Sequence, residues 1–185
     1  MTKEEIIKQP NLVVADQQRD IINEAFRTVR TKLEFTMGFD GQNKVVMVTS
    51  MNPGSGKTFI TANLSTAYAL KGKRVLIMDL DLRKASLSEY VGNPQMGISN
   101  YLSGQIDDWH EIITPLGQVD CLPSGVIPPN PAELLSTPRF KAIIEAVREE
   151  YDLIFMDCPP VEIVADAEII NPVADLTLFA VRAGL

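Results

Sequence analysis

The sequence predicts an α/β fold, a mainly parallel β-sheet covered by helices on both faces. Short apolar runs, each closed by small or acidic residues, alternate along the chain with segments of helical periodicity. The runs are apolar at both alternating positions, which is typical of parallel strands covered on both faces. Strand–helix–strand alternation favours a doubly covered sheet. At 185 residues the chain is most economically one domain.

The strands and helices are expected in the following order. The segment "TFITANLSTAYAL" follows the first strand as a helix, and "RFKAIIEAVREEY" forms a helix before the fourth. Asn130 with Pro131, and Thr137 with Pro138, each place a capping residue before a proline, which predicts two further helix starts. The five predicted strands are residues 44–50, 74–79, 119–123, 153–157 and 176–181.

Residues 16–35 predict an amphipathic helix near the N-terminus. Its outer arc carries Glu24, Arg27 and Arg30, which taken alone are typical of a solvated face with i,i+3 pairing. We expect its apolar side to pack on the sheet. That side is formed by Ile22, Ala25, Phe26, Val29 and Leu33.

Composition excludes several classes of function. The net charge is −7, and residues 149–185 account for all of it with eight acidic groups and one basic group. An acidic balance argues against nucleic acid as a partner. No apolar run approaches the roughly 18 residues of a membrane span, so we expect a soluble chain. Cys121 and Cys158 are expected to be reduced thiols, and His110, the single histidine, rules out a zinc cluster.

The segment "VVMVTSMNPGSGKTFITANL" runs from a predicted strand through a small-residue turn into a predicted helix. It departs from the pattern GxxxxGK[ST] because Met51 stands where the first glycine is expected. Glycines let backbone N–H groups turn toward a ligand, and a helix N-terminus favours phosphate. We expect a nucleotide-binding loop formed by Pro53, Gly54, Ser55, Gly56, Lys57, Thr58 and Phe59.

Three carboxylates follow apolar strands, where a magnesium triphosphate needs them. Asp157 comes directly after "LIFM", and "VLIMDLDLR" supplies Asp79 and Asp81, two residues apart. A lone Asp after a strand is about as often a turn former as a functional acid. Three of them at two strand ends, beside a phosphate loop, would converge beyond the carboxyl edge of the sheet.

The chain resembles the bacterial tyrosine kinases, the P-loop kinases of capsule and exopolysaccharide export. The resemblance implies a P-loop NTPase fold of the deviant Walker A, partitioning-ATPase-like type. It covers nearly the whole chain in family order. The matching motifs are the Walker A element "SMNPGSGKT", the Walker A′ element "VLIMDLDLRK", the Walker B element "LIFMDCPP", the segment "PPNPAELL" and the helix "EAFRTVR", which fits E-x-x-R-x-x-R.

The resemblance implies an enzyme that uses ATP and Mg²⁺ to phosphorylate tyrosine. Lys57 and the loop N–H groups would hold the phosphates, and Thr58, Asp79 and Asp157 would organise Mg²⁺. Asp81 would accept the proton of the tyrosine hydroxyl. How Asp79 and Asp81 divide their roles stays open, as does whether Arg83 binds phosphate or anchors its loop. The implied catalytic residues are Lys57, Asp79, Asp81 and Asp157.

The resemblance also implies partners. In the family, the helix motif carried here by Glu24, Arg27 and Arg30 joins subunits of a ring, so that the tyrosines of one subunit enter the next subunit's site. A transmembrane activator, a polysaccharide co-polymerase that is separate or fused, would hold the kinase at the cytoplasmic face of the membrane. Residues 1–40 would form an extension carrying the oligomerisation helix and 41–185 the nucleotide-binding core. The family's final helix and strand and its tyrosine-rich tail are not found before Leu185, so we expect either a truncated form or substrate tyrosines that come from elsewhere.

Two rival readings remain. An ATPase switch of the partitioning or cell-division type would dimerise around ATP without phosphorylating protein. Its hallmark is a second lysine early in the loop, where this chain has Asn52. A small-molecule kinase or plain ATPase would need a different acceptor pocket, and no arginine-rich lid suggests one.

Overall fold

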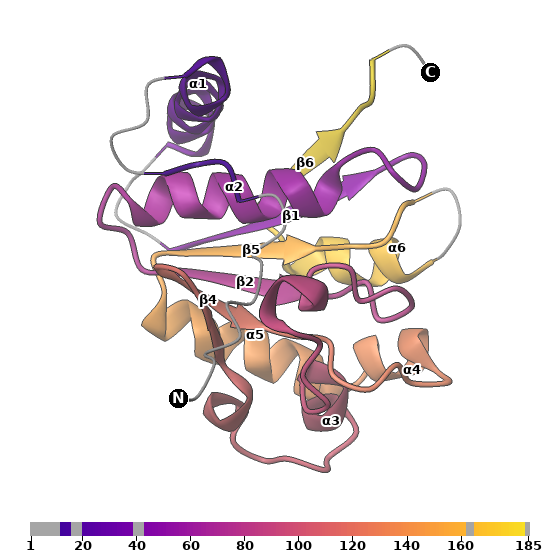
Figure 1. Ribbon diagram of the computed structural model, residues 1–185. Coiled ribbons are helices and arrows are strands. Elements are labelled where there is room, and N and C mark those ends of the chain that lie inside the picture. The colour runs from indigo at the N-terminus through magenta and orange to yellow at the C-terminus, as the bar shows by residue number, and fades with distance from the viewer. Residues whose placement is uncertain (1–11, 16–19, 39–42, 162–164, 184–185) are drawn as a thin grey trace, which may run out of the picture.

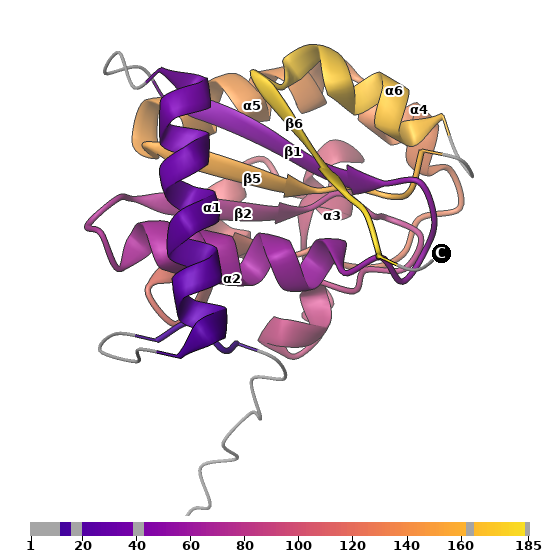
Figure 2. The same ribbon diagram turned by 90° about the horizontal axis from the view of Figure 1, so that it is seen from above.

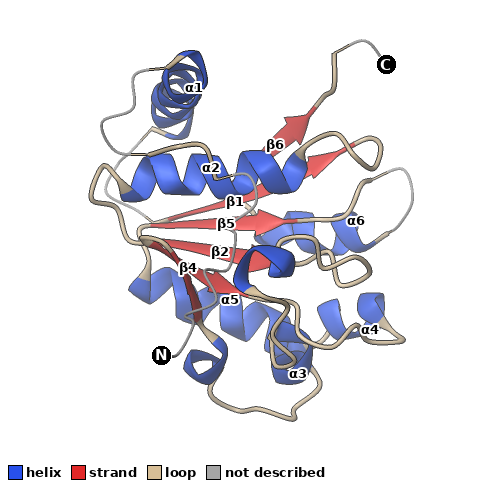
Figure 3. Ribbon diagram, in the orientation of Figure 1, coloured by secondary structure: helices blue, strands red, loops and turns tan. Residues whose placement is uncertain are grey.

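The computed structural model describes residues 12–15, 20–38, 43–161 and 165–183, and it contains a six-stranded sheet in the order β3-β4-β2-β5-β1-β6 (Figure 1, Figure 3). Every neighbouring pair is parallel except β3–β4. The mainly parallel α/β fold is therefore confirmed. The strands are β1 Lys44–Ser50, β2 Val75–Asp79, β3 Thr114–Leu116, β4 Val119–Leu122, β5 Leu153–Asp157 and β6 Leu176–Ala180.

Strand prediction succeeded for five of the six strands. β1 and β5 have the predicted bounds, and β2, β4 and β6 each differ by one residue at one end. β3 was missed because it has three residues and Pro115 at its centre. It lies at the edge of the sheet, where a missing N–H costs no ladder bond.

Helices cover both faces of the sheet (Figure 1, Figure 2). Strand residues alternate between two cores, so that Val46 packs with α2 on one face and Met47 packs with α5 on the other. Three 3₁₀ turns, η1 Ser88–Val91, η2 Trp109–Ile112 and η3 Asn171–Val173, complete the connections. The helices are α1 Ile21–Met37, α2 Lys57–Ala69, α3 Ile98–Leu102, α4 Pro131–Leu135, α5 Pro138–Glu150 and α6 Asp166–Ile170.

The helices α4 and α5 begin at the two predicted prolines, Pro131 and Pro138. Neither preceding side chain caps its helix, which corrects the predicted caps. The Thr137 hydroxyl instead donates to the carbonyl oxygen of Leu134 at 2.7 Å. Proline at the first helical position is thus the part of the signal that the structure retains.

Helix α1 packs on α2 rather than on the sheet, which corrects the sequence-based expectation (Figure 1). Phe26 is buried against the ring of Phe59, with 5.8 Å between centroids, and Leu33 is partly buried. Ile22 and Val29, predicted to be inside, are 49% and 38% exposed. The first four residues of the predicted helix, 16–19, lie outside the described residues.

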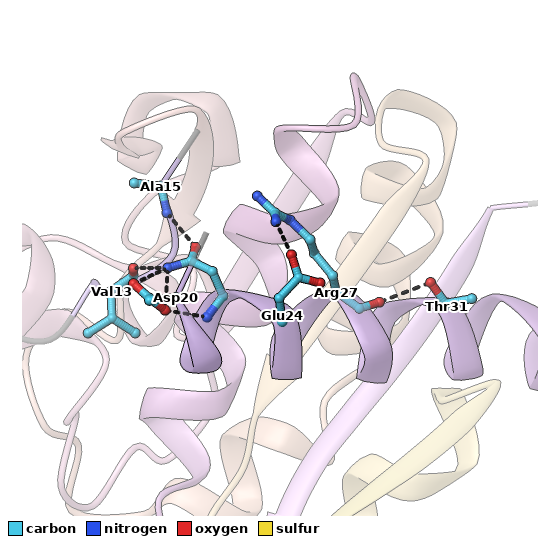
Figure 4. A network of polar contacts seen from close by, with 7 residues as sticks. Val13, Ala15, Asp20, Glu24, Arg27 and Thr31 are labelled. Atoms are coloured by element: carbon cyan, nitrogen blue, oxygen red, sulfur yellow. Dashed lines mark hydrogen bonds and ion pairs between the residues drawn. The ribbon is translucent and has the colours of Figure 1, made fainter. Parts of the chain in front are cut away.

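Polar contacts explain why α1 buries a different face from the one expected (Figure 4). Asn23 is 1% exposed; its amide oxygen accepts from Ala15 N at 3.1 Å, and its amide nitrogen donates to Val13 O at 3.1 Å. Asp20 caps the helix by accepting from Asn23 N at 2.8 Å. Arg30 reaches inward and donates to the carbonyl oxygen of Ala67 at 2.7 Å. These bonds fix the buried arc around Asn23, Phe26 and Arg30.

Two further expectations concern membrane-spanning helices and the cysteine thiols. Within the described residues, no helix combines the length and apolar character required to cross a bilayer. Cys121 and Cys158 are both free thiols, as predicted, and both are buried. Burial raises the pKa of both thiols well above the usual value.

Candidate active site

The loop between β1 and α2 has the geometry of a phosphate-binding loop. Gly54 and Gly56 have φ angles of 75° and 87°, a region that residues with a β-carbon rarely adopt. Gly56 caps α2 without a side-chain hydrogen bond. The first N–H groups of a 13-residue helix are therefore available to an anion.

A pocket of about 240 Å³ lies between this loop and the segment that follows β2. Six of the seven predicted loop residues line it, and Ser55 does not, because its hydroxyl donates to Asn52 O at 2.9 Å. Sequence analysis missed three lining residues, Lys84, Ser86 and Pro160. Lys84 is the last residue of "VLIMDLDLRK" and Pro160 the last residue of "LIFMDCPP", so the two motifs contained the available signal. The lining residues are Pro53, Gly54, Gly56, Lys57, Thr58, Phe59, Asp81, Lys84, Ser86 and Pro160.

Asp157 joins the end of β5 to the first turn of α2. Its carboxylate accepts from the Thr58 hydroxyl at 2.6 Å and from the Thr61 hydroxyl at 3.5 Å. Burial, with a contribution from the charge of Asp81, raises its pKa to about 7 although the Thr58 bond and Lys57 oppose the shift. The pairing of Thr58 with this acid is the arrangement expected around a phosphate-bound metal.

Asp79 is fully buried and turned toward η1. Its Oδ2 accepts from Ser88 N at 2.8 Å and from the Ser88 hydroxyl at 2.7 Å, while its Oδ1 is buried without a hydrogen-bond partner. Burial and the neighbouring Asp157 raise its pKa to about 8. Asp79 does not line the pocket.

Asp81 is the predicted acid that does line the pocket. Its carboxylate accepts from Lys84 N at 3.2 Å, and its carbonyl oxygen accepts from Ala85 N at 2.8 Å. Ala85 has a φ of 53°, a conformation that costs a residue with a β-carbon about 1 kcal/mol. The turn after β2 is thus held in one shape that keeps Asp81 beside the loop.

Arg83 anchors that turn. Its guanidinium forms a two-point ion pair with Asp166 at the start of α6, with Nε–Oδ2 at 2.9 Å and Nη2–Oδ1 at 3.1 Å. Asp166 is 1% exposed, and Arg83 is absent from the pocket lining. Of the two roles left open for Arg83, this geometry supports anchoring.

The residues present fit a magnesium nucleotide. Within the described part of the chain, no group of three or more His, Cys, Asp or Glu side chains could hold a metal unaided. Mg²⁺, however, usually takes one or two carboxylates together with phosphate oxygens and waters. The Thr58 hydroxyl, the Asp157 carboxylate and the unpartnered Oδ1 of Asp79 suit that mode. A cation would also offset the burial and the weaker charge repulsion that together raise both acid pKa values.

The predicted oligomerisation residues on α1 are not equivalent. Glu24 and Arg27 form an exposed ion pair (Figure 4). Arg30 is mostly buried between α1 and α2, with a side-chain exposure of 17%. The expectation that all three face outward is wrong for Arg30.

The chain is similar in sequence to known proteins. A family model described as an AAA domain matches residues 43–181. The tyrosine-protein kinase wzc of Salmonella typhimurium is 38% identical over 95% of this chain, which spans 24% of that protein. The tyrosine-protein kinase YwqD of Bacillus subtilis is 36% identical over 95% of this chain, which spans 75% of it.

A solved structure gives the same result. The kinase domain of the Escherichia coli tyrosine kinase ETK superposes with a TM-score of 0.87 at 34% identity, covering 95% of this chain and 69% of that one. Both likenesses cover 95% of this chain. The chain belongs to the bacterial tyrosine kinase family of P-loop proteins.

Proposed function

We propose that this chain is an ATP- and Mg²⁺-dependent protein-tyrosine kinase. The observation that carries the proposal is the place of Asp81, which lines the phosphate pocket together with Lys57 and Thr58. A carboxylate held there can accept the proton of an incoming hydroxyl. The related proteins that are named tyrosine-protein kinases make tyrosine the acceptor that we assign.

The side chains of the pocket divide the work of transfer. Lys57 and the loop N–H groups hold the phosphates, and Thr58 with Asp157 holds the metal. Asp81 takes the tyrosine proton as the hydroxyl oxygen bonds to the γ-phosphorus and the bond to the β-phosphate oxygen breaks, leaving ADP. Bound Mg²⁺ supplies charge neutralisation for the phosphates. Asp79, tied to Ser88, supports the site from behind, directly or through water.

The assembly around this site is also a proposal, since the chain spans about a quarter of the Salmonella relative. Residues 1–40 would be an extension and 41–185 the core of one kinase domain. Copies would assemble in a ring through the α1 motif, with Glu24 and Arg27 at the contact and Arg30 holding the helix on α2, and would phosphorylate tyrosines in trans. A transmembrane activator, separate or fused, would hold the ring at the cytoplasmic face of the membrane, where it would regulate capsule or exopolysaccharide export.

Phosphotyrosine formation tests the activity. Purified chain is incubated with Mg²⁺, ATP and a tyrosine-rich peptide, and the product is read by mass spectrometry. We expect phosphotyrosine on the peptide. Release of free phosphate alone would instead support the ATPase switch, which Asn52 disfavours because that class carries a lysine there.

Light scattering with Mg²⁺ and ATP tests the ring. We expect the mass to rise with protein concentration, and a Glu24→Ala, Arg27→Ala double variant to stay at the monomer mass. A Thr36→Ala variant, which changes another exposed position on α1, is the matched control. A constant monomer mass for the unmodified chain would overturn the oligomer.

A further inference from the structure

Two hollows continue outward from the phosphate pocket. The first, about 480 Å³, shares Lys84 with the pocket and extends along Ser88 and Glu89. The second, about 630 Å³, shares Val126 and Ile127 with the first and runs between α3 and α4. We call the two hollows together the trough. It starts at the catalytic pocket and leads away from it.

The floor of the trough is apolar and open. Val126 and Ile127 are 53% and 54% exposed and are followed by Pro128 and Pro129. Contiguous exposed apolar surface with a polar rim is typical of a binding groove. The rim carries the exposed amide groups of Gln105 and Asn130. An apolar floor with a polar rim suits a polypeptide, which presents apolar side chains and backbone hydrogen-bonding groups together.

The floor is held in place by the fold. The Ser99 hydroxyl donates to the carbonyl oxygen of Val126 at 2.7 Å, and Ser99 N donates to Ser124 O at 3.0 Å. Gly97 packs so closely that a β-carbon on it would lie 2.2 Å from Gly125 N. A surface fixed in this way binds without first losing conformational freedom.

The same floor is tied to the acids of the site. Ser124 N donates to the Ser88 hydroxyl at 2.8 Å, and that hydroxyl donates to Asp79 at 2.7 Å. Lys84, whose N–H holds the Asp81 carboxylate, forms the wall between pocket and trough. The position of the trough relative to Asp81 is therefore set by direct bonds.

We propose that the trough binds the acceptor polypeptide beside its tyrosine, with an apolar side chain of that polypeptide seated on Val126 and Ile127. A tyrosine whose hydroxyl reaches Asp81 must have its backbone outside the pocket, and the trough continues from the pocket at Lys84. As an acceptor site the trough rests on the proposed kinase function. As a polypeptide-binding surface it can be tested by binding alone.

The test uses two labelled peptides that carry phenylalanine in place of the acceptor tyrosine, flanked by leucines in one and by serines in the other. Fluorescence anisotropy measures their dissociation constants with Mg²⁺ and a non-hydrolysable ATP analogue. We expect the leucine peptide to bind roughly fivefold to tenfold more tightly, near the low end of what an apolar group gains in a hydrophobic pocket. Equal affinities would overturn the proposal.

The Val126→Ser, Ile127→Ser double variant should lose this preference while its affinity for the ATP analogue stays unchanged. Both side chains are more than half exposed, so the variant should fold, which its melting temperature checks. Ile21→Ser, at an isoleucine of α1 that is 89% exposed, is the matched control and should keep the preference. A preference that survives in the double variant would also overturn the proposal.

Two outcomes separate this proposal from its neighbours. If the double variant binds both peptides normally but has a lower oligomer mass, the trough holds a second copy of the chain and the proposal fails. If the unmodified chain forms no phosphotyrosine yet prefers the leucine peptide, the kinase function fails and the trough stands as a polypeptide-binding surface.

Discussion

The sequence predicted both the phosphate-binding loop and helix α1. The loop residues lie where they were expected, whereas α1 buries a different face from the one expected. The acids of the pocket follow strands whose register is fixed by the sheet, with Asp79 directly opposite Asp157 on the neighbouring strand. Helix α1 lies on a single helix, α2, so its rotation depends on a few bonds made by Asn23 and Arg30. Positions fixed by many backbone bonds follow from a sequence, whereas the rotation of a peripheral helix does not.

Each region contains a buried polar atom without a hydrogen-bond partner, Oδ1 of Asp79 in the active site and Nε of Arg30 on α1. In the active site, burial raises the pKa values of both Asp79 and Asp157. On α1, the side-chain amide of Asn23 is bonded at its oxygen and its nitrogen. The buried acids of the active site therefore lower the stability of the fold, and a ligand can restore it. The hydrogen bonds of Asn23 on α1 stabilise the fold directly.

The largest difference between the two regions should appear with Lys57→Met. Lys57 lines the pocket and is 8% exposed, and removing its charge should lower phosphotyrosine formation by about 10³-fold. Lys71→Met makes the same substitution in the surface ion pair with Glu34 of α1, and its activity should be unchanged. Rates from the phosphotyrosine assay compare the two. Equal losses would remove Lys57 from phosphate binding.

Asp81→Asn should come next, with a loss of about 10²-fold in transfer. ATP affinity should change little, because a proton acceptor acts on the tyrosine and not on the nucleotide. Asp107→Asn, at an aspartate whose side chain is 94% exposed, is the matched control. Kinetics at saturating ATP measure the effect. Transfer at the unmodified rate would contradict the role of Asp81.

Much of this site could be predicted because its residues are contiguous in sequence. Six of the seven predicted loop residues line the pocket, and Asp81 joins them. What could not be predicted depends on contacts distant in sequence. The partner of Arg83 is Asp166, and Asp79 turns toward Ser88 through a strained turn at Ala85. No local pattern specifies which of two neighbouring acids will be diverted in that way.

The fold, too, was predicted where the sequence carries a local pattern and missed where it depends on other contacts. Apolar runs predicted five strands, since each is buried on both faces, and the three-residue edge strand β3 carried no such signal. For α1, the most apolar arc was expected inside, yet Ile22 is exposed and Asn23 is buried. The polar partners of Asn23 lie in residues 13–15, a segment without periodicity.

The pH dependence of stability should have opposite signs in the two regions. The folded-state pKa values of Asp79 and Asp157, about 8 and about 7, lie above the unfolded value, so their contribution is present at acid pH and lost as pH rises toward 8. The pKa of Asp20 on α1 is lowered by the backbone N–H of Asn23, so its contribution is lost as pH falls through the acid range. Asp79→Asn should therefore flatten the loss at high pH and Asp20→Asn the loss at low pH.

Denaturant unfolding without Mg²⁺ or nucleotide, from pH 4 to pH 8, measures both slopes. Between pH 5 and pH 8 the Asp79→Asn variant should gain on the order of 2 kcal/mol in free energy of unfolding relative to the unmodified chain. Added Mg²⁺ and ATP should reduce that gain, since the ligand stabilises the ionised acids. Parallel pH profiles for the variant and the unmodified chain would show that ionisation of buried Asp79 does not lower the free energy of unfolding.

The smallest predicted effects come from two adjacent residues of α1, and they invert the usual rule for apolar and polar side chains. Asn23→Ala should lower the free energy of unfolding by about 1–3 kcal/mol, because it leaves the carbonyl oxygen of Val13 and the N–H of Ala15 without their partner. Ile22→Ala, at a side chain that is 49% exposed, should change it by less than about 0.5 kcal/mol. Both are read by denaturant unfolding at a protein concentration low enough to keep the chain monomeric. A larger loss for Ile22→Ala than for Asn23→Ala would mean that α1 buries its apolar arc in solution, as its sequence alone suggests.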